Sequence, residues 1–260
     1  MHPEAFHLGN FTVHWYGVSV ALGFALGLWL AARRGLRTGL PQEWIADLGL
    51  PLIVGTVLGA RSLYVLTYWK TQFAPAPFWE VFAVWKGGLV FYGGLVGASA
   101  AAIAYILIRG WPLWKLADAL APSVALGFAV GRLGCLMNGC CFGNACDLPW
   151  AIHFPAEHQT GGAGVHPTQF YDFAWAFALY AALAWGYRHK TFDGQIFALY
   201  LAGYAGLRAL FEIFRGDYGS ERFGLLTPAQ VFSVGVMAAA ALLYFNLQRR
   251  GPAAPPAPVA

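Results

Sequence analysis

The stretch VHWYGVSVALGFALGLWLAARRGLR, residues 13–37, decides the fold. Its first twenty residues contain no Asp, Glu, Lys or Arg, and three arginines follow in its last five residues. About 20 apolar residues in a helix are enough to cross the hydrocarbon core of a bilayer. Lys and Arg accumulate in cytoplasmic loops, so the arginines mark the cytoplasmic end of this segment. The stretch therefore predicts a transmembrane helix whose N-terminal end faces outward.

Similar apolar segments recur along the whole chain of 260 residues, of which 58% are hydrophobic and 11% charged. A soluble domain carries about 25% charged residues, so that class is excluded. We predict an all-α integral membrane protein with seven transmembrane helices, the N-terminus outside and the C-terminus cytoplasmic. The predicted spans are 13–32, 46–68, 88–108, 116–138, 168–187, 194–214 and 227–247.

The segments outside the spans predict one membrane domain in a single orientation. The N-terminus lacks the basic region of a cleaved signal peptide, so the first span is expected to remain as an anchor. The basic residues lie in scattered short loops, which argues against a nucleic-acid partner. Two long loops on the outer side, 69–87 and 139–167, are expected to form a cap. We expect one membrane domain over residues 1–250 and a disordered Pro/Ala tail at 251–260.

Four arginines fall inside or at the edge of predicted spans: Arg61, Arg132, Arg208 and Arg215. Each costs about 2.5–3.5 kcal/mol at a helix centre, so a counter-charge, a cavity or an anionic ligand is required. Arg208, Glu212 and Arg215 have the i, i+4, i+7 spacing of one helix face. Glu212 can neutralise one of these two arginines. The remaining positive charge favours an anion, and the guanidinium fork suits the phosphate of a lipid headgroup.

Polar aromatic side chains are predicted near the outer ends of the spans. Tyr16 lies in span one and Tyr92 begins span three, beside Gly93 and Gly97. Each tyrosine is either an interfacial anchor or part of a site. The two glycines either let a ligand approach or form a helix-packing seam.

The four cysteines are spaced C-x4-C-C-x4-C, from Cys135 through Cys140 and Cys141 to Cys146. This spacing differs from the paired C-x2-C of common zinc sites, so we expect no metal and no cofactor. A structural disulfide is one interpretation, for example between Cys140 and Cys146, because an outward-facing loop lies in an oxidising compartment. Packed free thiols, redox catalysis and a metal site are the alternatives.

Six motifs in order give the chain a resemblance to phosphatidylglycerol–prolipoprotein diacylglyceryl transferases, a family of seven-span enzymes of the bacterial inner membrane. The resemblance covers about residues 12–247. The motifs, in chain order, are HWYG (14–17), GARSLYVLTY (59–68), GGLVFYGGLVG (87–97), GRLGCLMNGCCFG (131–143), HPTQFYD (166–172) and GYAGLRALFEIFR (203–215).

The chain departs from the family signature G-R-x-G-N-F-x-N-G-E-x-x-G at two polar positions. Cys135 stands where the family has Asn, and Cys140 where it has Glu. Tyr92 stands where the family often has a histidine. These changes resemble those of a cysteine-bearing branch of the family.

The resemblance implies transfer of the diacylglyceryl group from phosphatidylglycerol to the lipobox cysteine of prolipoproteins, with release of glycerol phosphate. The expected partners are therefore phosphatidylglycerol, prolipoprotein signal peptides and membrane lipid. Expected catalytic residues are Arg132, Arg208, Tyr92 and Tyr16, and the expected substrate-binding residues are Arg215, Glu212, Asn138, Gly143, Arg61, His166 and Gln169. The rival functions are a thiol–disulfide oxidoreductase built on the cysteines and a lipid-binding or transport protein without catalysis.

Overall fold

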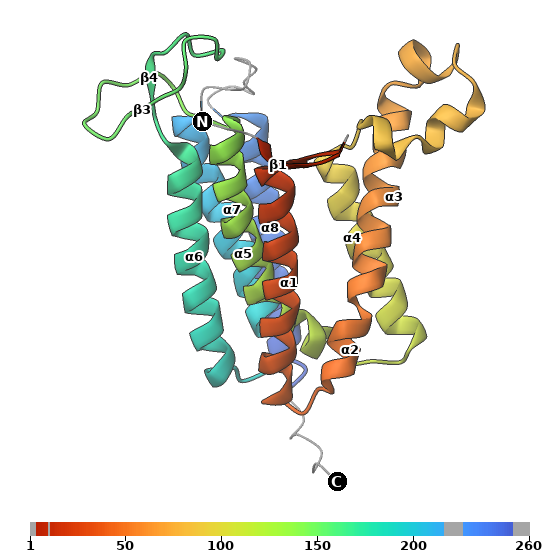
Figure 1. Cartoon of the computed structure of the whole chain (residues 1–260). Helices are drawn as coiled ribbons and strands as arrows, with labels where there is room; N and C mark the ends of the chain where they lie inside the picture. Colours follow the sequence, from red (N-terminus) through yellow and green to blue (C-terminus); the bar gives the residue numbers. More distant parts are fainter. Residues whose placement is uncertain (1–3, 10, 216–225, 252–260) are drawn as a thin grey trace. The chain divides into compact units, whose positions relative to one another are not determined.

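A computed structural model describes residues 4–9, 11–215 and 226–251 of the chain (Figure 1). The chain divides into two compact units. The first contains the residues up to Arg34 and those from Ala117 onward, and the second is Gly35–Leu116. The predicted tail at 252–260 lies outside the described residues.

The first unit is a bundle of long helices, seen side by side in Figure 1. These are α1 (Trp15–Leu36), α5 (Leu113–Asn138), α6 (Thr168–Gly186), α7 (Gln195–Phe211) and α8 (Pro228–Gln248). Gly23 and Gly127 let α1 and α5 approach closely, because a Cβ added at Gly23 would lie 3.1 Å from the carbonyl oxygen of Gly127. α7 packs against both α6 and α8.

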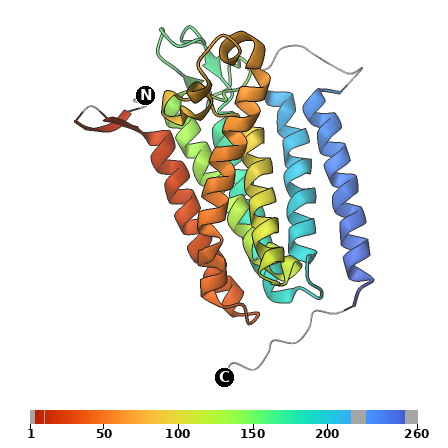
Figure 2. The ribbon, with the colours of Figure 1, turned by 90° about the vertical axis from the view of Figure 1, so that its right-hand side faces the viewer.

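The second unit is built on two helices that run side by side, α3 (Gly49–Thr67) and α4 (Phe91–Ile108), preceded by the short α2 (Gln42–Asp47) (Figure 2). A Cβ added at Gly93 would lie 2.3 Å from the carbonyl oxygen of Gly59. One added at Gly97 would lie 2.2 Å from that of Gly55. The glycines beside Tyr92 therefore form a packing seam between α3 and α4.

The segment between α3 and α4 contains a π-helical turn, η1 (Trp69–Phe73), and two 3-10 turns, η2 (Phe78–Phe82) and η3 (Val84–Lys86). The Arg61 side chain holds this segment in place from α3. It donates hydrogen bonds to the carbonyl oxygens of Val81 (2.8 Å) and Glu80 (2.5 Å). It also donates to the carbonyl oxygen of Gly87 (2.8 Å). Arg61 is thus supplied with partners by the backbone of its own unit.

The sequence did not predict two small antiparallel sheets in the first unit. A hairpin of β1 (Glu4–Leu8) and β2 (Phe11–His14) precedes α1. The loop after α5 contains the pair β3 (Ile152–His153) and β4 (Gly164–Val165). These strands are short. The second pair lies in the loop between the motifs GRLGCLMNGCCFG (131–143) and HPTQFYD (166–172).

All seven predicted spans are helical, and six of these helices are long and apolar enough to cross a membrane. The described chain is accordingly that of a multi-pass membrane protein. The helix outside this group of six is α6, which has 19 residues and carries Thr168, Gln169 and Asp172 in its first five.

The end of α7 differs from the prediction of one continuous helix face. The α-helix ends at Phe211, and Glu212–Phe214 form a 3-10 turn, η5. Arg215 is extended, with φ −80° and ψ 134°, and forms a β-bridge with Gly143. Arg215 therefore does not share a helix face with Arg208 and Glu212, as the i, i+7 spacing suggested, because the chain leaves the helix to pair with the loop after α5.

Candidate functional site

Two ion pairs lie where α5, α6 and α7 meet in the first unit. Arg132 on α5 contacts Asp172 on α6, with 3.1 Å between Nε and Oδ2. Arg208 on α7 pairs with Glu212 one helical turn later. The side chains of Arg132 and Asp172 are only 12% and 14% exposed, so solvent screens this pair weakly. Glu212 also accepts a hydrogen bond from the Thr227 hydroxyl (3.2 Å), which joins the site to the start of α8.

Asp172 lies among the cationic groups, since Arg132, Arg215 and Arg208 all act electrostatically on its carboxylate. The structure thus brings together the three arginines that we expected to share a site. Within the described residues, this cluster contains three guanidinium groups and two carboxylates. Sequence reasoning missed Asp172, because it compared charges along one helix and not between helices. The signal was an ionisable residue inside a predicted span.

A small pocket lies between α5, α6 and α7. Its lining includes Phe128, Asp172, Leu179, Tyr200, Tyr204 and Arg208. Leu179 follows Asp172 by seven residues on α6, and Tyr200 precedes Arg208 by eight on the antiparallel α7. At 1.5 Å per residue, the pocket therefore extends about 10 Å from its charged end toward aromatic and aliphatic side chains. It has one charged end and one apolar end.

The loop after α5 is held against the start of α6 by buried polar side chains. Gln169 donates from Nε2 to the carbonyl oxygen of Cys140 (2.8 Å), and Thr168 donates from its hydroxyl to that of Cys141 (2.6 Å). The backbone of His166 accepts from the amide of Gly143 (2.9 Å). A Cβ at Gly143 would lie 2.6 Å from the Cβ of His166, so glycine is required there. The candidates Gln169, His166 and Gly143 thus position the loop beside the arginines.

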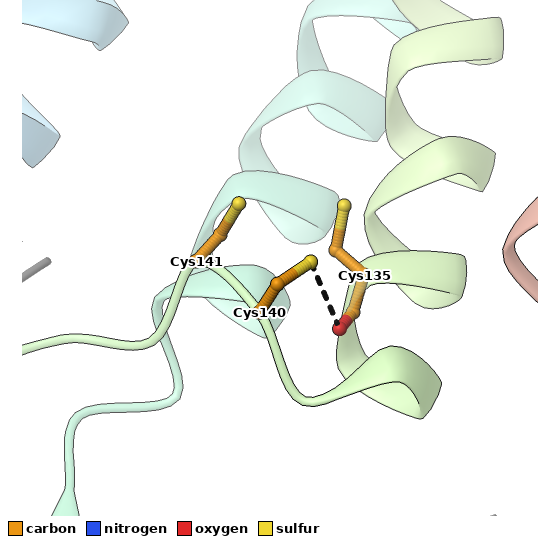
Figure 3. A group of neighbouring side chains, drawn as sticks. All are labelled: Cys135, Cys140 and Cys141. Carbon is orange, nitrogen blue, oxygen red and sulfur yellow. Dashed lines mark hydrogen bonds between the residues drawn. The ribbon is translucent and has the colours of Figure 1, made fainter. Parts of the chain in front are cut away.

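The four cysteines are free in the structure, so a disulfide between Cys140 and Cys146, one of the interpretations of their spacing, is absent. Cys140 instead lies with Cys135 and Cys141, and the three sulfur atoms are within 4.8 Å of one another (Figure 3). Hydrogen bonds from Cys135 and Cys140 lower the pKa of the Cys141 thiol. Burial opposes this effect, and the charges of Arg132 and Arg215 reinforce it.

The other expected residues lie at different distances from this cluster. Tyr16, in the first turn of α1, is close enough to interact electrostatically with Arg132 and the three clustered cysteines. Asn138, the last residue of α5, interacts with the thiol of Cys140. Tyr92 and Arg61 belong to the second unit, where Tyr92 is 61% exposed in the first turn of α4 and packs its ring against that of Phe91.

The bundle and its site define a class: a multi-pass membrane protein with an arginine–carboxylate cluster at the charged end of an apolar pocket. Comparison with known proteins gives the family. The sequence profile described as "Prolipoprotein diacylglyceryl transferase" matches residues 3–246. The chain belongs to this family.

Individual relatives agree along nearly their whole length. The chain is 36% identical over 251 residues to the phosphatidylglycerol–prolipoprotein diacylglyceryl transferase of Geobacillus kaustophilus strain HTA426, covering 94% of this chain and 92% of the relative. It is 36% identical to that of Methylibium petroleiphilum strain PM1, with 95% and 97% covered. The Legionella pneumophila strain Corby enzyme is 35% identical, with 91% and 93% covered.

Proposed function

We propose that this chain transfers the diacylglyceryl group of phosphatidylglycerol to the lipobox cysteine of prolipoproteins. The relatives that it matches over more than nine-tenths of its length are named for this reaction. The observation that carries the proposal is the pocket of the first unit, whose charged end holds Asp172 and Arg208 and whose remaining lining is mostly apolar. An anionic headgroup and an acyl chain match these two ends.

The headgroup phosphate binds between Arg132 and Arg208 in this proposal. Asp172 engages the Nε of Arg132, which leaves the terminal amino groups of that guanidinium as the phosphate-binding side. Glu212 orients Arg208 from one helical turn away. Arg215 and Asn138 complete the headgroup site at the loop after α5. Guanidinium groups held by carboxylates in this way are preorganised, so little side-chain entropy is lost when phosphate binds.

The reaction breaks the bond between the glycerol carbon of the diacylglyceryl group and the phosphate oxygen. A carbon–sulfur bond forms to the lipobox cysteine, and the oxygen leaves with the electron pair as part of glycerol phosphate. Arg132 and Arg208 stabilise the negative charge that develops on the leaving phosphate. The thiol must lose its proton, because thiolate is the nucleophile. Tyr16, which lies near Arg132, positions the reacting groups, and water accepts the proton.

We further propose that the chain spans the bacterial cytoplasmic (inner) membrane seven times, with α6 as the remaining span and the N-terminus outside. The buried polar residues at the start of α6 contact the loop that carries the cysteines, and this accounts for the lower hydropathy of the helix. The arginines that follow the apolar part of α1, Arg33 and Arg34, support a cytoplasmic position for that end.

A transfer assay tests the function. Purified protein is incubated with labelled phosphatidylglycerol and a lipobox peptide, and the thioether product is measured by mass spectrometry. Arg132→Ala and Arg208→Ala should each lower product formation by about 10²–10³-fold, as expected when a group that stabilises developing charge is removed. Arg109→Ala is the matched control, because this arginine follows α4 and contacts Tyr105 at an exposed position.

Two results would contradict the proposal. Full activity in Arg132→Ala or Arg208→Ala rejects the phosphate site. Binding of phosphatidylglycerol by the wild-type protein without any thioether product would instead favour a lipid-binding protein.

A further inference from the structure

The loop after α5 places three thiols at one point. Cys135 lies in the last turns of α5, and Cys140 and Cys141 follow in the loop (Figure 3). Their sulfur atoms all lie within 4.8 Å of one another. Cys135 is buried and the other two are half-buried, so the cluster is shielded without being closed. Cys146 is not part of this group.

The backbone is held in an unfavourable conformation to bring these thiols together. Cys141 has φ +62°, and it is the only non-glycine residue with positive φ among those described. This left-handed conformation costs a residue with a Cβ about 1–2 kcal/mol. Such a strained residue persists when its surroundings fix it, and it points to function. Here the hydroxyl of Thr168 and the amide of Gln169 fix it, and both side chains are only 1% exposed.

We propose that Cys135, Cys140 and Cys141 form a three-thiolate binding site for a soft metal ion, Cu(I) or Zn(II). Thiolate ligands select these ions over hard ones such as Mg²⁺ or Ca²⁺. The inference stands on the geometry of the three sulfurs and does not depend on the transfer reaction. It also revises the expectation of no metal, which rested on the spacing of the cysteines along the chain.

Ligand number and charge favour Cu(I) over Zn(II). Structural zinc sites are almost always four-coordinate, whereas this group offers three donor atoms. Three thiolates around Cu(I) carry a net charge of −2. The guanidinium groups of Arg132 and Arg215, which act electrostatically on Cys141, oppose that charge. Zn(II) at the same thiolates would take a water molecule as its fourth ligand.

A disulfide is the competing use of the same residues. It would join two of the sulfurs and leave the third without a partner. A disulfide alone gives no reason for the third thiol to be held at the same point by a strained backbone. The two uses also differ experimentally, because a disulfide consumes thiols before metal is added.

Metal titration of the full chain in detergent, reduced and freed of metal, tests the proposal. Cu(I) is added against a chromophoric Cu(I) chelator and Zn(II) against a chromophoric zinc chelator. We expect one Cu(I) per chain, with three sulfur neighbours in X-ray absorption, and weaker binding of Zn(II). Cys135→Ser, Cys140→Ser and Cys141→Ser should each lower Cu(I) affinity by at least about 100-fold. Cys146→Ser is the matched control and should bind as the wild type does.

A protection experiment on the wild-type protein covers the case in which a serine variant fails to fold. Bound Cu(I) should slow alkylation of Cys135, Cys140 and Cys141, read peptide by peptide, and leave Cys146 unchanged. Tighter binding of Zn(II) at the same three residues would keep the site and reassign its ion. The proposal is overturned if neither ion binds, if the serine variants bind as the wild type does, or if freshly isolated protein contains a disulfide among the three.

Discussion

Two charged clusters lie along α5, fourteen residues apart, and they are built differently. Near the start of the helix, Asp118 is fully buried and accepts hydrogen bonds from Lys190 Nζ (2.9 Å) and from the amides of Gly194 (2.8 Å) and Phe197 (3.0 Å). Near its end, Arg132 and Asp172 form a pair that adjoins Arg208 and a pocket. The protein itself supplies the partners of Asp118, whereas the second cluster lies at the charged end of a small pocket.

The electrostatics of the two clusters agree with this difference. Burial lowers the pKa of Lys190, but the charge of Asp118 and hydrogen bonds to Asp193 and Asp118 outweigh it, so the pKa is raised. Lys190 therefore stays charged and paired at neutral pH. The cluster at the end of α5 gathers the guanidinium groups of Arg132, Arg208 and Arg215 around the Asp172 carboxylate. A buried ion pair of the first kind supports the fold, and we propose that the second cluster binds an anionic substrate.

The largest effect on stability is expected from the cluster near the start of α5, Asp118 with Lys190 and Asp193, which we call the closed cluster. Asp118→Asn removes the buried partner of Lys190 and leaves Asp193 as its carboxylate, and breaking a buried pair in this way costs up to about 3–5 kcal/mol. Thermal or denaturant unfolding in detergent measures this change. Replacing both partners, as Asp118→Asn with Lys190→Met, should restore part of the loss. Unchanged stability in the single variant would show that the cluster is not structural.

The cluster near the end of α5, Arg132 and Asp172 with Arg208 and Glu212, is called the open cluster. A substitution there should lower the rate of transfer more than the stability. Asp172→Asn removes the group that orients Arg132, and a displaced catalytic group costs about 100-fold in rate. The transfer assay measures this, with folding checked by size-exclusion chromatography. Asp193→Asn is the control, a carboxylate of the closed cluster, and should retain the wild-type rate. A rate for Asp172→Asn equal to that of the wild type would show that the reaction does not need the Arg132–Asp172 ion pair.

The smallest effect is expected where the open cluster meets α8. Thr227 caps this helix in a capping box with Gln230 and donates its hydroxyl to Glu212. Thr227→Ala should lower the free energy of unfolding by about 1 kcal/mol. It should slow transfer less than Asp172→Asn does, while Thr227→Ser retains both contacts. A larger loss of activity than in Asp172→Asn would show that the Thr227–Glu212 contact matters more to the reaction than the Arg132–Asp172 pair, against this expectation.

Hydropathy predicted the helices because a bilayer imposes a minimum apolar length on each span. The predicted and observed helices differ by a few residues at their ends, as with 116–138 and the observed Leu113–Asn138. The hairpin before α1 was not predicted, because two strands of five and four residues leave a weak pattern. Arg34 was assigned to a loop, yet it is buried and donates to the carbonyl oxygen of Ala119 (2.6 Å).

The sequence predicted which arginines belong to the site, but not which side chains they contact. Arg132 and Arg208 were found from the sequence because each falls in a predicted span, where a charged side chain requires a partner or a ligand. Their arrangement depends on contacts between helices, which no spacing along one helix reveals. This is why Asp172 was missed and why Arg215 was placed on a helix face that ends at Phe211.

The central claim is that the cluster of Arg132 and Arg208 binds the phosphate of phosphatidylglycerol. Native mass spectrometry of protein from nanodiscs with equal phosphatidylglycerol and phosphatidylcholine measures which lipid stays bound. The wild type and the Asp118→Asn, Lys190→Met variant should retain phosphatidylglycerol preferentially, and the Arg132→Ala, Arg208→Ala variant should lose this preference. Retention of phosphatidylglycerol by the double arginine variant at the wild-type level would contradict the account.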